Sequence, residues 1–205
     1  MQAFTAVAMA VAGLGFATVP SAQAAVVEIM TEVGSNVDVS ASGTINLAGF
    51  NHPGYEQYSS GPNGVIPSLG SILAGAPGTL TTDLYAPFSG PTAFGSGGFT
   101  QPSSGSGDRV GVRQDSPTTD FIVVPQGYVS EAPLEGASTY VGKTFASLGI
   151  TPGTYVWSWG SGSDLDSLTL KVVTPSTPAV PEPASLGLLA TALAGLLVKR
   201  RRKVA

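Results

Sequence analysis

Residues 151–173, with the sequence TPGTYVWSWGSGSDLDSLTLKVV, indicate the fold most clearly. Apolar residues alternate with small or polar ones on both sides of a glycine-rich centre: Tyr155, Trp157 and Trp159 before it, Leu168, Leu170 and Val172 after it. A period of two places each set on one face of a β-strand. Residues 160–164, between the two runs, have the length of a hairpin loop. The stretch therefore predicts a β-hairpin, introduced by a turn at 151–153.

The same alternation recurs in short stretches along the chain, at residues 26–32, 37–41, 44–47, 110–113, 121–124 and 139–141. Helical periodicity is not sustained in the central region, because glycines and a proline interrupt the one candidate, at 64–74. A single helical turn is expected between residues 136 and 149. The pattern predicts a mostly β protein with one β-sandwich domain of jelly-roll type over residues 25–173.

Two segments of the central region are poor in strand signals. Residues near 87–117 are rich in Gly, Pro, Ser and Thr, which favours a long surface loop. We expect Phe88, Phe94 and Phe99 to attach that loop to the domain. Residues 174–180 contain two prolines among small and polar residues, and they predict an extended linker.

The charge of the chain is divided unevenly. The 205 residues are 42% hydrophobic and only 11% charged, and five of the nine basic residues lie together at 199–203. Residues 25–180 contain 12 acidic and 4 basic residues, hence a charge of -8. So acidic a domain repels phosphate backbones, and we expect no nucleic-acid partner. The sequence has no Cys, which excludes a disulfide framework and a thiolate metal site.

The beginning of the chain has the pattern of a secretory signal peptide. Residues 3–19 are almost wholly apolar or small, and Pro20 and Ser21 then interrupt the run before Ala22-Gln23-Ala24. Small residues at Ala22 and Ala24 predict that signal peptidase removes residues 1–24 and leaves Ala25 as the first residue. No Lys or Arg precedes the run, so either the free amino group supplies the positive charge or the true start lies upstream. The alternative is an Ala-rich helix buried in a core.

The end of the chain has three physical parts in a fixed order. Pro181-Glu182-Pro183 holds Glu182 on a stiff, extended stretch, because each proline restricts its own φ and the residue before it. The apolar residues 184–198 are expected to form a short transmembrane helix, which spans the bilayer if flanking cations reach the interface. The basic cluster marks the cytoplasmic side and consists of Lys199, Arg200, Arg201, Arg202 and Lys203.

This three-part tail, residues 181–205, resembles the PEP-CTERM sorting signal of Gram-negative bacteria that make extracellular polysaccharide. The resemblance implies that an exosortase recognises Pro181, Glu182 and Pro183, removes the tail and releases or transfers the domain to the cell surface or matrix. The basic cluster would be the stop-transfer anchor. Residues 144–160, 166–170 and 31–47 are similar to stretches in proteins with such tails, which implies an exported β domain and no chemistry. The alternative is a plain membrane anchor that is never cut.

Catalytic residues are not evident in the central region. The single histidine, His52, lies in Asn51-His52-Pro53-Gly54, a composition typical of a turn, and no G-x-S-x-G motif accompanies it. Carboxylates that could pair for glycoside cleavage lie mostly in loop-like stretches: Asp83, Asp108, Asp115, Asp120 and Glu131. Solubility is their expected role. We therefore expect neither an enzyme nor a bound cofactor.

Two binding sites are candidates in the predicted hairpin. Asp164 and Asp166 could hold a calcium ion, but the loop lacks the further ligands of an EF-hand. The stripe of Tyr155, Trp157 and Trp159 could stack on sugar rings, although such a stripe more often belongs to a core. Burial of the two tryptophans would favour the core, and their exposure would favour a carbohydrate-binding module.

Three functions follow from these patterns. The first is a non-enzymatic protein of the cell surface or extracellular matrix, exported as a membrane-anchored precursor, with signal peptidase and an exosortase as processing enzymes. The second is a lectin-like module that binds extracellular polysaccharide. The third is a secreted hydrolase whose catalytic residues come together only in the fold.

Overall fold

The computed structural model describes residues 25–50, 52–114 and 120–174. The predicted signal peptide, the tail at 181–205 and all of the linker except Thr174 lie outside these ranges. Within them, the helices are too short for any to cross a membrane.

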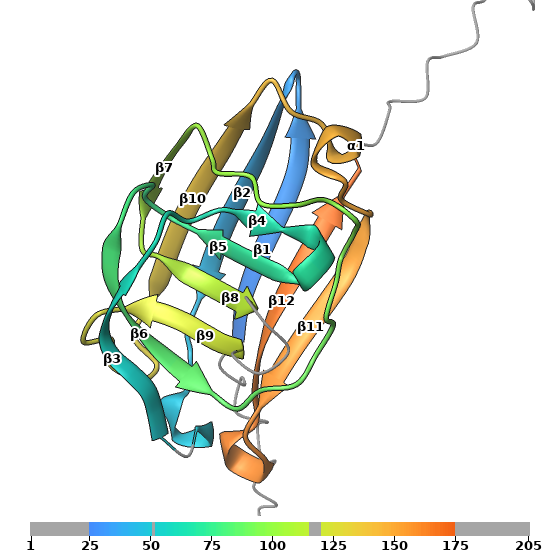
Figure 1. The fold of residues 1–205 in the computed structure, drawn as a ribbon. Coiled ribbons are helices and arrows are strands. Elements are labelled where there is room, and N and C mark those ends of the chain that lie inside the picture. Colours follow the sequence, from blue (N-terminus) through green and yellow to red (C-terminus); the bar gives the residue numbers. More distant parts are fainter. Residues whose placement is uncertain (1–24, 51, 115–119, 175–205) are drawn as a thin grey trace, which may run out of the picture.

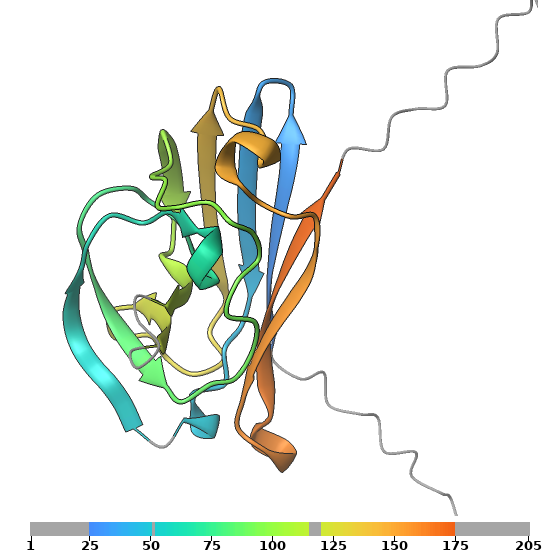
Figure 2. The ribbon, with the colours of Figure 1, turned by 45° about the vertical axis from the view of Figure 1, so that its right-hand side comes forward.

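The described residues form two six-stranded β-sheets packed face to face, which confirms the predicted β-sandwich (Figures 1 and 2). Sheet A contains, in spatial order, β11 (Gly153–Trp159), β12 (Asp166–Val173), β1 (Ala25–Val33), β2 (Asn36–Gly43), β10 (Leu134–Val141) and β7 (Ser104–Gly107). Sheet B contains β3 (His52–Ser60), β6 (Leu80–Ala86), β9 (Asp120–Pro125), β8 (Val110–Gln114), β5 (Ser71–Ala74) and β4 (Val65–Ile66). The short helices are η1 (Leu47–Gly49), η2 (Pro67–Leu69), α1 (Phe145–Leu148) and η3 (Gly162–Asp164).

Sheet A follows the alternating pattern of the sequence. In β1, Val26 and Met30 face the core while Ile29 between them is exposed. A tight turn joins β1 to β2, and Gly34 there adopts a φ of +63°, which glycine adopts without steric cost. The predicted hairpin of β11 and β12 is also confirmed, with Trp157 opposite Leu168.

The connectivity differs from an eight-stranded antiparallel jelly roll. Among the described residues there are twelve strands, and β1 pairs in parallel with β12, starting with Ala25 beside Ser167. A parallel neighbour requires a long crossover connection, and here the rest of the domain supplies it. The first and last strands of the domain therefore lie side by side within sheet A.

Sheet B contains most of the strands that the alternation does not predict. All four residues of β5 are buried, so the strand has no polar face to produce an alternating pattern. The pairing of β3 with β6 shifts register twice, and Gln57 in β3 has a φ of +54°. The helix candidate at 64–74 is wrong: β4, η2 and β5 occupy it.

The predicted loop at 87–117 is correct only in its first half. Residues 87–103 connect β6 of sheet B to β7 of sheet A and pass β11 and β4 on the way (Figure 1). Backbone bridges hold them between Ser89 and Ser158, Gly95 and Ile150, and Thr100 and Val65. The rest includes β7 and β8. Of the three phenylalanines, Phe94 is buried and Phe88 packs partly against the core, but Phe99 is 53% exposed. The loop therefore links the two sheets, with Phe99 on its outside.

Two smaller predictions have opposite outcomes. The single helical turn is confirmed as α1, which a capping box of Thr144 and Ser147 starts and Gly149 ends. The strand at 44–47 is wrong, because Asn46 instead caps η1 by accepting a hydrogen bond from the backbone N–H of Ala48 at 2.9 Å.

The core lies between the sheets and contains most of the buried apolar side chains of both. A second, smaller cluster of Leu73, Leu84 and Val123 lies apart from it, with Phe121 packed against it. Val123 alternates along β9 with Ile122 and Val124, which belong to the main core. The smaller cluster therefore lies on the outward face of sheet B.

Candidate functional site

The aromatic stripe of the β11–β12 hairpin belongs to the core. Trp157 is 0% exposed and Trp159 is 3% exposed, while Tyr155 is half-buried. Trp159 stacks on Phe50 with ring centroids 5.0 Å apart and planes 18° apart. These three side chains therefore form no open platform for sugar rings, and the core interpretation of the stripe is confirmed.

Both indole N–H groups donate to backbone carbonyls of distant segments. Trp157 Nε1 donates to Pro91 O at 2.9 Å, and Trp159 Nε1 donates to Asn46 O at 3.1 Å. Buried indoles normally find such partners, since an unpaired N–H in a core is costly. Each tryptophan thereby fixes a loop as well as filling the core.

Of the two candidate calcium ligands, Asp166 binds the backbone. Asp166 is buried and accepts hydrogen bonds from the N–H groups of Asn46 at 2.7 Å and Ser167 at 2.6 Å. Burial raises the pKa of Asp166, and these two hydrogen bonds oppose that shift. Asp164 lies in η3, and its carboxylate accepts a hydrogen bond from the Ser163 hydroxyl at 3.4 Å. Within the described ranges, no cluster of three or more His, Asp or Glu side chains could hold a metal ion.

Two of the other carboxylates also bind backbone N–H groups. Asp83 is buried in β6 and accepts from Gln57 at 2.8 Å and Gly127 at 2.7 Å, which ties β3 and the turn after β9 to β6. Asp108 lies between β7 and β8 and accepts from Glu135 N at 3.0 Å. Both side chains therefore connect neighbouring backbone segments.

The remaining catalytic candidates are placed as follows. Asp120 begins β9, and Glu131 lies in the connection to β10 with a φ of +67°. Asp115 lies outside the described residues. His52 is the first residue of β3, pairing with Ala86, so the predicted turn at 51–54 is wrong from His52 onward. The His52 side chain lies outside the part of the chain that the structure describes.

The core contains a buried acid that is not among the candidates from the sequence. Glu28 of β1 is 0% exposed, and neither carboxylate oxygen has a hydrogen-bond partner among the described residues. The Tyr140 hydroxyl of β10 is buried and likewise unpartnered there. Burial raises the pKa of Glu28 well above its usual range, and burial together with Glu28 raises the pKa of Tyr140. The sequence does indicate this burial. Glu28 lies two residues from Val26 and two from Met30, so alternation along the strand places its side chain on the same inward face.

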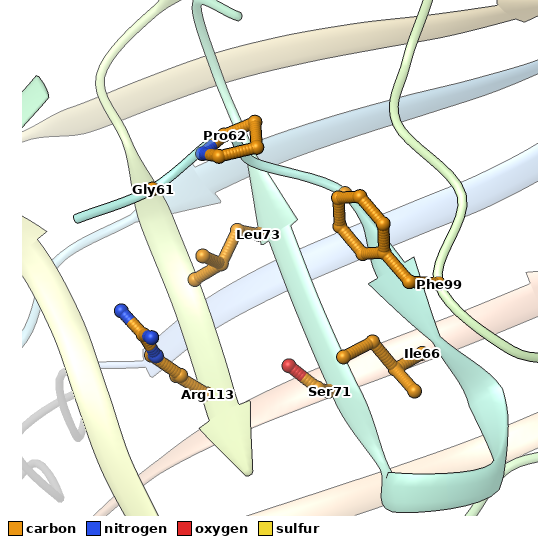
Figure 3. A pocket seen from close by; sticks show the side chains of 8 residues that line it. Gly61, Pro62, Ile66, Ser71, Leu73, Phe99 and Arg113 are labelled. Atoms are coloured by element: carbon orange, nitrogen blue, oxygen red, sulfur yellow. The ribbon is translucent and has the colours of Figure 1, made fainter. Parts of the chain in front are cut away.

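A pocket of about 270 Å³ opens on the outward face of sheet B (Figure 3). The lining residues come from β4, β5, β8 and the adjoining loops: Gly61, Pro62, Gly64, Ile66, Ser71, Leu73, Phe99 and Arg113. Leu73 belongs to the outward apolar cluster, so this wall of the pocket is continuous with Leu84 and Val123. The pocket combines an apolar surface with one charged group.

Two side chains of the pocket are fixed from outside it. Phe99 precedes Thr100, whose backbone exchanges two hydrogen bonds with Val65, at 2.9 and 3.0 Å. A side chain at Gly64 would overlap Thr100 O and lie 2.9 Å from the Phe99 ring, so glycine allows this close approach. The Arg113 guanidinium lies 5.2 Å from the centroid of the Tyr58 ring, a cation–π distance.

The residues predicted for processing lie outside the described ranges, except Ala25, which begins β1. They comprise Ala22, Ala24, Pro181, Glu182, Pro183 and the cluster 199–203.

Comparison with known protein families identifies one region of the chain. Residues 179–203 match the family model described as the PEP-CTERM protein-sorting motif. No curated protein and no solved structure matches the chain. The motif implies export, anchorage in a membrane before processing, and processing by an exosortase. The chain is therefore a PEP-CTERM domain-containing protein.

Proposed function

We propose that this chain is a non-enzymatic protein of the cell surface or extracellular matrix, delivered when an exosortase removes its C-terminal tail. The observation that carries the proposal is the sorting motif at residues 179–203. The motif begins after β12 ends at Val173, so the tail follows a complete sandwich domain. Removing the tail therefore deletes no strand of either sheet.

The environments of the acidic and aromatic side chains support a structural rather than a catalytic domain. Asp83, Asp108 and Asp166 accept hydrogen bonds from backbone N–H groups. Such bonds hold the backbone segments on either side of each carboxylate together. Trp157 and Trp159 fill the core. These groups hold the domain together.

The tail contains three recognition features in a fixed order, which a membrane enzyme can recognise. Glu182 lies between two prolines, ahead of the apolar stretch 184–198 and the basic cluster. With the basic cluster on the cytoplasmic side, Glu182 is outside the membrane beside the exported domain. The carboxylate of Glu182 is then the group that an exosortase recognises.

A substitution at Glu182 tests this proposal. Glu182→Ala should leave export and membrane insertion intact but prevent removal of the tail, so the chain stays in the membrane fraction. Glu135→Ala is the matched control, since it removes an exposed acid from β10 of the domain. Fractionation and immunoblotting of an exosortase-positive host and of the same host without the enzyme give the readout. Release of the Glu182→Ala chain, or equal retention of the parent chain in both hosts, contradicts the proposal.

A further inference from the structure

We infer that two copies of this chain associate through the outward face of sheet A, the face turned away from the core. A ridge on β1 and β12 of one copy lies in a hollow over β2 and β10 of the other. Figure 1 shows sheet B on the opposite side of sheet A, so sheet B covers none of this face. The inference does not rest on the proposed function, because self-association and tail removal involve different residues.

The hollow lies on the half of the face next to β7 and has a volume of about 320 Å³. The outward side chains that line it come from β2, β7 and β10: Ser40, Ser42, Ser106, Glu135 and Ala137. Ser42 pairs with Glu135, and Ser40 pairs with Ala137, so these residues lie in two adjacent rows across the strands. Small side chains therefore form the hollow, and Glu135 is the one charged residue among the described ones that line it.

The ridge occupies the other half of the face and continues the same two rows. Ile29 of β1 pairs with Ser40, and Val27 pairs with Ser42. Ile29 is 41% exposed and Val27 is half-buried. Next to Ile29 in its row lies Lys171 of β12, whose side chain is exposed. One half of the face therefore carries branched apolar side chains and a cation, and the other half carries small side chains and an anion.

A two-fold axis makes the two halves complementary. With the axis parallel to the strands, between β1 and β2 in the plane of the interface, β1 of one copy faces β2 of the second copy, and β12 faces β10. Ile29 then lies over Ser40 of the second copy, where the hollow receives it. Lys171 lies over Ala137 of the second copy, two residues along β10 from Glu135. Each contact occurs twice, because a two-fold interface uses the same surface on both copies.

Charge favours a second copy over a foreign partner. Among the described residues, the side chains of Lys171 and Glu135 have no hydrogen-bond or ion-pair partner. A partner of one charge sign would satisfy only one of these groups, whereas a second copy satisfies both. Residues 25–180 contain 12 acidic and 4 basic residues, so two domains repel each other overall. The two symmetry-related pairs of Lys171 and Glu135 supply the local attraction that association needs.

The area of the face suits a reversible dimer. The five longer strands of sheet A have seven to nine residues each. At a spacing of about 4.8 Å and a length of about 25 Å, they form a face of roughly 600 Å². Stable interfaces bury about 800 Å² on each partner, and weaker ones bury less. We therefore expect a dimer that dissociates in the range of about 1–100 µM.

Sedimentation velocity of the full chain, purified in detergent, tests the inference through a charge exchange. Lys171→Glu and Glu135→Lys, each alone, should raise the Kd of the dimer roughly tenfold or more, because like charges then meet at both facing pairs. An equimolar mixture of the two variants should associate about as tightly as the parent chain, because each facing pair again contains one acid and one base. Added salt should weaken the parent dimer.

Further variants assign the effect to this face. Lys143→Glu is the matched control for charge, because Lys143 is exposed in the connection after β10 and should leave the Kd unchanged. Ile29→Ser should raise the Kd roughly tenfold, because the ridge loses its apolar side chain twice in the dimer. Val129→Ser is the control for apolar surface, since Val129 is 70% exposed outside the face. The near-ultraviolet circular dichroism of the buried tryptophans verifies that each variant folds.

Three results would overturn the inference. The first is a parent chain that stays monomeric up to about 500 µM, which leaves the face to a different partner. The second is a dimer whose Kd is the same in Lys171→Glu and Glu135→Lys, which places the contact elsewhere, the tail included. The third is a mixture of these two variants that stays monomeric, which means that the two groups do not meet.

Failure here is distinct from failure of exosortase sorting. Self-association is measured on the uncleaved chain, and residues 179–203 take no part in the face. Glu135→Ala should therefore weaken the dimer and still lose its tail like the parent chain.

Discussion

The sandwich domain depends on contacts between distant residues, whereas the tail depends on the linear order of its residues. The described residues between 25 and 174 form two sheets whose packing is specified by distant contacts. Residues 179–203 match a family model through the linear order of a short motif, an apolar stretch and a basic cluster. We infer that changes in the tail affect where the chain goes, whereas changes in the domain affect whether it folds.

The largest expected effect is on location. Deleting residues 199–203 removes the cations that hold the apolar stretch 184–198 at the cytoplasmic side, so retention in the membrane should be lost. Replacing all five residues by Lys keeps the charge and should preserve retention. Fractionation measures location, and thermal unfolding should show an unchanged domain. A deletion variant that stays in the membrane contradicts this role of the basic cluster.

The next largest effect is on folding. Trp157→Ala should destabilise the domain by about 3–5 kcal/mol, because a fully buried indole and its hydrogen bond to Pro91 O are lost. Val156→Ala, at an exposed position of the same strand, should cost no more than about 0.5 kcal/mol. Denaturant unfolding of the exported chain measures both. Similar losses in the two variants would mean that the stripe does not support the core.

A smaller loss is expected at Arg109, a buried residue at the end of the β7–β8 connection, directly before β8. Its guanidinium donates to Gly61 O, Ala76 O and Gly78 O at 2.7–2.8 Å, which ties two loops to sheet B. Arg109→Met should leave those carbonyls unpaired and destabilise the domain by about 2–4 kcal/mol. Lys143→Met, at an exposed position, is the control for charge. Unchanged unfolding of Arg109→Met would show that water replaces the guanidinium.

The smallest effect, and the only stabilising one, is expected at Glu28. Its pKa is raised in the folded domain, so the folded state keeps the proton that the unfolded chain releases. The associated stability is present below the unfolded pKa of about 4.3 and is lost as the pH rises toward the folded pKa. Glu28→Gln should therefore flatten the decline in stability above pH 5 and stabilise the domain at pH 8 by about 1 kcal/mol or more. Parallel pH profiles of the two proteins would contradict this.

Sequence alone predicts sheet A better than sheet B. Alternating side chains identify β1, β2, β11 and β12, because each has one buried and one exposed face. The four buried residues of β5 produce no such alternation. The sequence of β7 is Ser-Gly-Ser-Gly, and it becomes a strand only because β10 offers backbone partners. Such a strand has no local signal.

The sites differ in the same manner. Pro181, Glu182 and Pro183 are consecutive, so the whole motif can be recognised in one short stretch of sequence. Leu73, Phe99 and Arg113 lie far apart in the sequence. The order of strands in sheet B and the bridge between Thr100 and Val65 bring them to one pocket. Phe99 is expected from the sequence to attach a loop to the domain, but in the structure its ring is exposed.

The intact mass of the chain recovered from outside the cell tests the central claim most directly, since it reports both ends together. In a host with the exosortase, the mass should correspond to a chain that begins at Ala25 and lacks the apolar stretch and basic cluster of the tail. In the same host without the enzyme, the membrane-bound chain should begin at Ala25 and retain Ala205. Chains of the same mass in both hosts, with residues 184–205 intact, would show that the tail is a plain anchor.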